Sequence, residues 1–238
     1  MEATYRQLRS ERPLVSLCTW SFVGHLCLLM CPPFSIFFMK HHVKPNTITV
    51  IMILLGAVGG ILFALPPIPC KIAAIVVYWL WFILDCSDGE VARHTKTFSK
   101  YGIQLDWIAH LVCHPLMVLA CWISFQQSSV PYSYLLTIMS ILFVTCELIR
   151  RQLIAFDTLL SASTEMGIKP TSAPPLYKWI VTQVLYFPNF VLLFPIIYVI
   201  CISFHWNYYT YIYIGWATFN CIFVFRDIIR YTLFFHNN

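Results

Sequence analysis

The chain alternates between long uncharged apolar runs and short polar segments. Such runs are typical of helices that cross a membrane, where about 20 apolar residues at roughly 1.5 Å per residue match a hydrocarbon core of about 30 Å. The pattern predicts six spans: Thr47–Leu65, Ile72–Leu84, Gly102–Phe125, Tyr132–Cys146, Trp179–Phe204 and Tyr208–Phe225. The polar stretch Arg150–Lys178 is predicted to be the only sizeable loop.

The segment before the first span has two interpretations. Its apolar run, Pro13–Met39, is uncharged apart from His25, but Pro32 and Pro33 interrupt it,. A basic repeat precedes the run and suits a short helix on an anionic membrane surface; it consists of Arg6, Arg9 and Arg12,. A surface or re-entrant helix is favoured over a seventh span, because a seventh span would move these arginines to the other side of the membrane.

Composition agrees with a membrane protein, since 59% of the residues are apolar and 11% are charged, against about 25% charged in soluble domains,. The predicted fold is an all-α integral membrane protein with six transmembrane helices preceded by an N-terminal interfacial or re-entrant helix. Residues 1–46 form the predicted juxtamembrane segment and 47–238 the membrane domain. This layout puts every Lys and Arg except Lys71 on one side, as expected for the cytoplasmic side,. The net charge of +5 therefore reflects topology rather than nucleic-acid binding,.

Carboxylates gather in one stretch between two of these runs, which reads DCSDGEVARHTKTFSKYGIQLDWIAH from Asp85 to His110. Asp85 and Asp88 are three residues apart, and Asp106 and His110 are four apart, so each pair shares one face of a helix,. Arg93 lies between the pairs and suits a bidentate grip on phosphate oxygens,. Three carboxylates and one arginine are the groups needed to hold a divalent metal and a diphosphate.

This stretch resembles the signature of the CDP-alcohol phosphotransferase family, D-x2-D-G-x2-A-R-x8-G-x3-D-x3-D. Seven of its eight fixed positions are matched, by Asp85, Asp88, Gly89, Ala92, Arg93, Gly102 and Asp106. The eighth, an aspartate in the family, is His110 here. The resemblance implies a membrane enzyme, usually a homodimer, that moves a substituted phosphate from a CDP-linked alcohol to an acceptor hydroxyl and releases CMP.

The resemblance also implies roles for single residues. Asp85, Asp88 and Asp106 are expected to bind metal, and oxygen ligands suit Mg²⁺ or Mn²⁺. The residues expected to bind the nucleotide and diphosphate are Gly89, Ala92, Arg93 and Gly102. Four further arginines at span ends are candidate clamps for a substrate phosphate, although snorkelling to lipid headgroups explains them equally well: Arg150, Arg151, Arg226 and Arg230,. Glu147 and Asp227 are their candidate partners, and His114 is interpreted as a polar packing residue.

His110 leaves three alternatives open. Imidazole is a competent general base near neutral pH, so an active enzyme with His110 as its catalytic base is the first. The others are an active enzyme whose base lies elsewhere and a pseudoenzyme that keeps the fold. The resemblance implies two divalent metals held by the signature aspartates, and imidazole, a softer and uncharged ligand, would weaken the second Mg²⁺ site.

Two classes of function therefore compete. The first is the transferase, acting in phospholipid or lipid-linked polymer synthesis, with either CDP-diacylglycerol or a soluble CDP-alcohol as donor and a lipid on one side of the reaction. The second is a non-catalytic membrane partner, or a small-solute transporter that uses Asp106 and His110 as a relay. The active site is expected to face the cytoplasm, from the inner membrane of a bacterium or from the endoplasmic reticulum or Golgi of a eukaryote.

Overall fold

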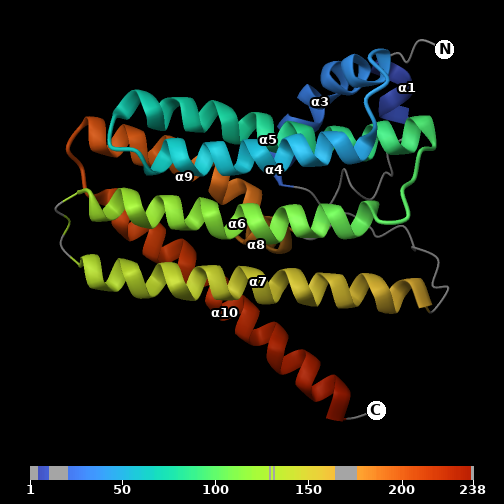
Figure 1. The fold of residues 1–238 in the computed structure, drawn as a ribbon. Coiled ribbons are helices and arrows are strands. Elements are labelled where there is room, and N and C mark those ends of the chain that lie inside the picture. Colours follow the sequence, from blue (N-terminus) through green and yellow to red (C-terminus); the bar gives the residue numbers. More distant parts are fainter. Residues whose placement is uncertain (1–4, 11–20, 129, 131, 164–175, 237–238) are drawn as a thin grey trace.

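The computed structural model describes residues 5–10, 21–128, 130, 132–163 and 176–236. These residues form helices joined by short connections and contain no strand (Figure 1). The helices are α1 (Tyr5–Ser10), α3 (Phe22–Lys40), α4 (Pro45–Ala64), α5 (Ile68–Thr95), α6 (Gly102–Gln126), α7 (Ser133–Ser163), α8 (Leu176–Leu185), α9 (Phe187–Ser203) and α10 (Tyr208–His236). The predicted all-α class is confirmed.

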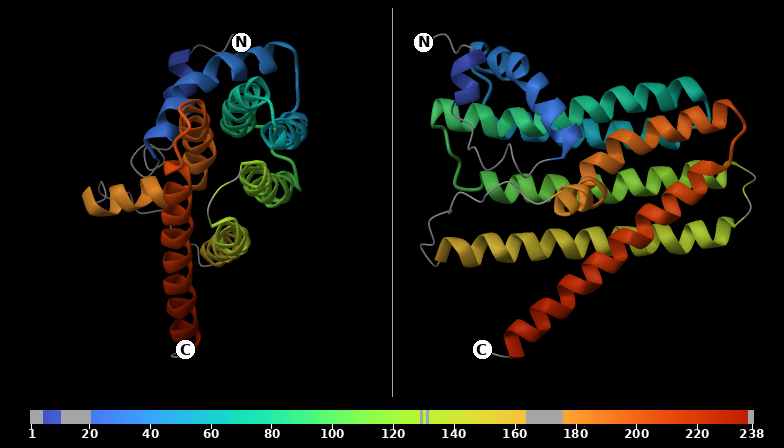
Figure 2. Two further views of the ribbon diagram at one scale, coloured as in Figure 1. Left: turned by 90° about the vertical axis from the view of Figure 1, so that its left-hand side faces the viewer. Right: turned by 180° about the vertical axis from the view of Figure 1, so that it is seen from behind.

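The core of the molecule is a bundle in which α4, α5, α6 and α7 lie side by side and alternate in direction (Figure 1). Helix α10 crosses this bundle obliquely, and its C-terminal part runs away from it (Figures 1 and 2). Among the described residues, six helical segments are long and apolar enough to cross a membrane: Phe22–Lys40, Pro45–Ala64, Ile68–Thr95, Gly102–Gln126, Ser133–Ala155 and Tyr208–Leu233. The chain is therefore a multi-pass integral membrane protein.

Helix α3 differs in direction from the bundle. In the end-on view α4 to α7 are seen along their axes, whereas α3 is seen lengthwise (Figure 2, left). It is docked on α5 by Glu90, whose Oε2 accepts hydrogen bonds from Ser35 Oγ at 2.6 Å and Cys31 Sγ at 3.3 Å. The large angle between α3 and the bundle axis favours the interfacial or re-entrant interpretation over a further span parallel to the others. Residues 13–20 of the predicted run lie outside the described residues.

The predicted fifth span, Trp179–Phe204, is two helices and not one. Helix α8 ends at Leu185, Tyr186 is extended with φ −74° and ψ 108°, and α9 begins at Phe187. Pro188 lies in the first turn of α9, where a missing N–H costs nothing, and a proline there prevents α8 from continuing,. Helix α9 has 17 residues, about 25 Å at roughly 1.5 Å per residue,.

The predicted loop Arg150–Lys178 is too long at both ends. Helix α7 continues to Ser163, and α8 already includes the last residues of the predicted loop. Between Arg150 and Gly167 the sequence has no proline or glycine, so no helix-breaking residue ends α7 directly after Arg150,. The middle of that loop, residues 164–175, lies outside the described residues. The longer helix matters because it carries Glu147 and Arg151 past the end of the predicted span.

Close packing of α4 against its neighbours depends on small residues. A Cβ on Gly59 would lie 2.6 Å from ring atom Cε1 of Tyr78 on α5, and one on Gly56 would lie 3.1 Å from Cβ of Cys113 on α6. Small residues at such positions let helix backbones approach closely inside a membrane. This packing holds α4 close against both α5 and α6.

The bundle has two polar ends. We call the end where α4–α5 and α6–α7 connect the far end, and the opposite end, with the α5–α6 connection, the site end (Figure 1). At the far end Lys71 is only 2% exposed, and its Nζ donates to Phe63 O at 2.8 Å and Ser124 Oγ at 2.9 Å. The ammonium also faces the rings of Phe63 and Tyr198,. Lys71 is the basic residue that the predicted topology set apart from the others.

Candidate active site

The acidic stretch folds back on itself at the site end. Helix α5 continues through the first half of the stretch to Thr95, and α6 begins at Gly102. Asp85 and Asp88 therefore lie about one turn apart on α5, and Asp106 and His110 lie about one turn apart on α6,. The structure brings Asp85 of α5 close to Asp106 and His110 of α6.

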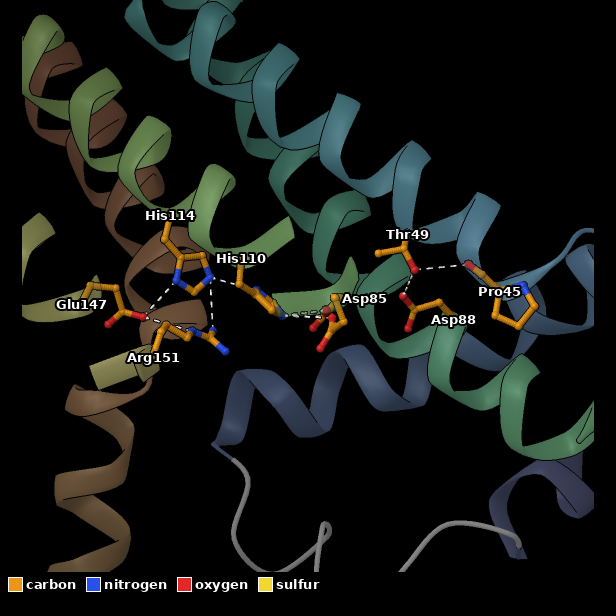
Figure 3. Close-up of polar contacts among 9 residues, drawn as sticks. Pro45, Thr49, Asp85, Asp88, His110, His114, Glu147 and Arg151 are labelled. Atoms are coloured by element: carbon orange, nitrogen blue, oxygen red, sulfur yellow. Dashed lines mark hydrogen bonds and ion pairs between the residues drawn. The ribbon is translucent and has the colours of Figure 1, made fainter. Parts of the chain in front are cut away.

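Three of these side chains meet at one point. His110 Nε2 lies 3.1 Å from Asp85 Oδ1 (Figure 3). The same nitrogen lies 3.5 Å from Asp106 Oδ1. One ligand atom from each of the three residues can be chosen so that all lie within 4.8 Å of one another. The side chain of His110 is 7% exposed and that of Asp85 14%, whereas Asp106 is 41% exposed. The cluster is therefore buried on the α5 side and open to solvent through Asp106.

The cluster fits a divalent cation. Two carboxylates held this close repel each other, and a shared cation relieves that repulsion. Carboxylate oxygens suit Mg²⁺ and Mn²⁺, and an imidazole nitrogen is a ligand that Mn²⁺ accepts more readily than Mg²⁺. Asp85, Asp106 and His110 are therefore able to hold one such ion between α5 and α6.

Asp88 lies apart from that cluster and faces α4. Its Oδ2 lies 2.6 Å from Thr49 Oγ1, and the same hydroxyl lies 3.2 Å from Pro45 O (Figure 3). The threonine hydroxyl is thus a hydrogen-bond donor that orients the second signature carboxylate. No sequence argument singled out Thr49, because a threonine in the first turns of a helix after Pro45 is an ordinary residue.

The remaining signature residues lie at the same end. A Cβ on Gly89 would come within 3.0 Å of Arg93 Nη1, so the glycine leaves room for the guanidinium to lie across α5. Gly102 begins α6 next to a hydrogen bond from Asn46 Nδ2 to Ser99 Oγ, which ties the start of α4 to the α5–α6 connection. Ala92, on the same turn of α5 as Gly89, is half-buried.

A second polar group, which the sequence interpretation missed, lies behind His110. His110 Nδ1 is 3.1 Å from His114 Nε2, and His114 Nδ1 is 2.9 Å from Glu147 Oε1 on α7 (Figure 3). Arg151 contacts both, with Nη2 3.3 Å from His114 Nε2 and Nε 3.4 Å from Glu147 Oε1. His114 is therefore a member of a buried polar chain and more than a packing residue. The sequence does carry a signal for this chain. His110 and His114, and likewise Glu147 and Arg151, are ionisable residues four positions apart in apolar helices,.

The four candidate clamp arginines are not together. Arg151 points into the bundle, and Arg150 Nη1 lies 3.9 Å from Glu147 Oε2. On α10 the guanidinium of Arg226 pairs with Asp227 at 2.6 Å and covers the ring of Phe223, and Arg230 is exposed. The predicted partners Glu147 and Asp227 are thus confirmed. Arg151 is connected to the signature position His110 through His114.

A comparison with protein families agrees with this geometry. Residues 42–223 match the family model described as CDP-alcohol phosphatidyltransferase. The matched segment includes the whole acidic stretch and runs from just before α4 into α10. No individually curated protein gives a significant match.

Proposed function

The chain belongs to the CDP-alcohol phosphatidyltransferase family, and we propose that it transfers a substituted phosphate from a CDP-linked alcohol to an acceptor hydroxyl, releasing CMP. The observation that carries this proposal is the convergence of Asp85, Asp106 and His110 at one end of an apolar bundle. A transporter relay built from Asp106 and His110 alone would leave Asp85, Asp88 and Arg93 without a common purpose. The family membership and the convergence of Asp85, Asp106 and His110 therefore favour the transferase.

The reaction requires negative charge to be neutralised and an acceptor oxygen to be held in line with the breaking bond. Mg²⁺ or Mn²⁺, when bound, would supply positive charge to the diphosphate and so stabilise CMP as a leaving group. Asp85 and Asp106 would hold the ion, and Asp88, oriented by Thr49, would complete the acidic set. Arg93 would bind diphosphate oxygens, in the space that Gly89 leaves free,.

His110 is proposed as the catalytic base. Its Nε2 would take the proton of the acceptor hydroxyl, the freed oxygen would attack phosphorus, and the bond from phosphorus to the CMP oxygen would break. The position of Nε2 supports this role, because it faces the carboxylates and the solvent-open side of the cluster near Asp106. Gly102 and Ala92 would leave room for the nucleotide beside it.

The substrates are proposed from the position of the site. The end of a membrane bundle lets a water-soluble group meet a lipid, so one of the two alcohols is proposed to be a lipid. The donor would then be CDP-diacylglycerol with a small polar acceptor, or a soluble CDP-alcohol with a lipid acceptor. We place the site end in the cytoplasm, where the positive-inside rule puts most basic residues, and propose a homodimer.

The test is CMP release by the purified protein in lipid nanodiscs. The panel combines CDP-diacylglycerol and CDP-linked small alcohols with varied acceptors, each in Mg²⁺ and in Mn²⁺. A parallel melting series asks whether CMP with metal raises the unfolding temperature, since a ligand that binds only the folded state stabilises it. Release that depends on metal and is lost in Asp106→Ala would establish the transferase and identify its donor.

A negative result would also be informative. If no donor yields CMP and neither nucleotide nor metal raises the melting temperature, the transferase proposal is wrong. If the native protein is inactive but His110→Asp releases CMP, the natural protein is a catalytically silent family member whose role lies in its partners. A proton or ion current in proteoliposomes that needs Asp106 would instead favour the transporter.

A further inference from the structure

Two cysteines from different helices meet between α7 and α10. Both helices start at the far end and run toward the site end (Figure 1). They are first joined by Ser140 Oγ and Tyr213 OH, 2.8 Å apart, and further along by Cys146 Sγ and Cys221 Sγ, 3.3 Å apart. The C-terminal part of α10 then runs away from the bundle (Figures 1 and 2). The thiol pair therefore lies close to the part of α10 that leaves the bundle.

The exposure of the cysteines sets this pair apart. Nine cysteines are described, all as free thiols, and six of them are buried. Buried thiols behave as small apolar residues and are inert. The three that are partly exposed are Cys70, Cys146 and Cys221, and Cys70 lies at the far end, in the first turn of α5. Two of the three accessible thiols among the described cysteines are thus in contact with each other.

The two sulfur atoms are close enough to be joined. The Sγ atoms of Cys146 and Cys221 lie 3.3 Å apart, and a disulfide needs them at about 2.05 Å, so they have to approach by roughly 1 Å,. Side-chain rotation can supply a movement of that size. As thiols the two residues gain little from the contact, because S–H is a weak donor and sulfur a weak acceptor. The hydrogen bond alone therefore gives no strong reason for them to meet here.

The surroundings set how fast the pair reacts. The thiolate is the reactive form of cysteine, and apolar surroundings disfavour it, whereas a neighbouring guanidinium favours it. Arg150 lies one turn beyond Cys146 on the same face of α7,. We therefore expect Cys146 to react first and the reaction to be slow, on a scale of minutes to hours.

We infer that Cys146 and Cys221 form a redox modification site, in which a hydroperoxide converts the two thiols into a disulfide that fastens α10 to α7. One thiolate attacks an oxygen of the hydroperoxide, which breaks the O–O bond and leaves a sulfenic acid and an alcohol, or water where the oxidant is hydrogen peroxide. The second thiol attacks the sulfenic sulfur, which forms the S–S bond and releases water. The two sulfurs together lose two electrons, which reduce the hydroperoxide, and the two thiol protons end in the alcohol and the water.

The site is tested on the purified protein in lipid nanodiscs. One sample is treated with hydrogen peroxide, which arrives from the water, and another with tert-butyl hydroperoxide, which enters the lipid. The remaining thiols are alkylated, and peptic peptides are identified by mass spectrometry. The expected product is a crosslink within one chain, between the peptides of Cys146 and Cys221, present in most molecules with at least one of the two reagents and reversed by dithiothreitol.

Serine variants identify the two sulfurs. Cys146→Ser and Cys221→Ser should each abolish the crosslink, and Cys70→Ser is the matched control that removes the other partly exposed thiol and should retain it. The crosslinked native protein should melt about 5 °C higher than the reduced protein, because the crosslink restricts the unfolded chain. This rise should disappear with dithiothreitol and be absent from Cys146→Ser and Cys221→Ser.

The native protein decides the question even if a serine variant does not fold. Full alkylation of Cys146 and Cys221 after both treatments, or their oxidation to sulfinic acid without a crosslink, would overturn the inference. A crosslink between two chains would overturn it as well, because the partner of each thiol would then belong to a second copy. An unchanged melting temperature of the crosslinked protein would show that the disulfide does not fasten α10. None of these readouts needs turnover, so they are independent of the proposed function.

Discussion

The two ends of the bundle bury charge in opposite ways. At the far end a single cation, Lys71, is satisfied by a carbonyl, a hydroxyl and two aromatic rings. At the site end Asp85 and Asp106 converge on one imidazole, and Glu147 lies buried behind it. The far end thus satisfies its charge within the fold, whereas the site end keeps like charges together and needs a cation to balance them. We expect far-end substitutions to change stability and site-end substitutions to change activity.

The largest effect is expected from Asp106→Ala at the site end. Loss of this carboxylate removes part of the metal site and should lower kcat/KM for CMP release by roughly 10³-fold or more. Without metal, the same variant should melt at an equal or higher temperature than the native protein, because repulsion with Asp85 is gone. Both are measured in one nanodisc preparation. A variant that loses stability together with activity would show that Asp106 is structural.

The opposite outcome is expected from Lys71→Met at the far end. Methionine fills the volume but leaves Phe63 O and Ser124 Oγ without the ammonium, which should lower the free energy of unfolding by about 2 kcal/mol,. CMP release at a temperature where the protein is folded should not change. Lys40→Met, which removes an exposed lysine, is the control and should stay within about 0.5 kcal/mol,. A large loss of kcat in Lys71→Met would contradict the expectation that the far end contributes to stability and not to activity.

His110→Asp increases the negative charge at the site end. A carboxylate adds a negative charge next to the ion that Asp85 and Asp106 would hold, so the Mg²⁺ concentration for half-maximal CMP release should fall about tenfold while activity is retained. Melting without metal should occur at a lower temperature, because a third carboxylate joins Asp85 and Asp106. The measurements are a metal titration of CMP release and a melting curve in chelator. An unchanged metal dependence would show that His110 does not share the cation's surroundings.

The site end also shows which contacts the sequence could predict and which it could not. The spacing of Asp106 and His110 is local and needs only helical periodicity. Asp85 reaches them from α5 through the fold, which periodicity alone does not predict. The partnership of His114 with Glu147 joins two helices 33 residues apart, and no periodicity reports such a contact. The break before α9 had a local signal in Pro188, but the apolar run around it masks the boundary, because hydropathy does not register a missing N–H,.

The smallest effect is expected from Thr49→Val, which removes the hydroxyl 2.6 Å from Asp88 Oδ2 and keeps the shape of the side chain. Asp88 would remain in place but lose one orienting hydrogen bond, a net contribution of about 1 kcal/mol, so kcat/KM should fall about fivefold. Thr49→Ser, which retains the hydroxyl, should keep most of the activity. Equal losses in both variants would show that the methyl group matters and that Asp88 is oriented by something other than this hydrogen bond.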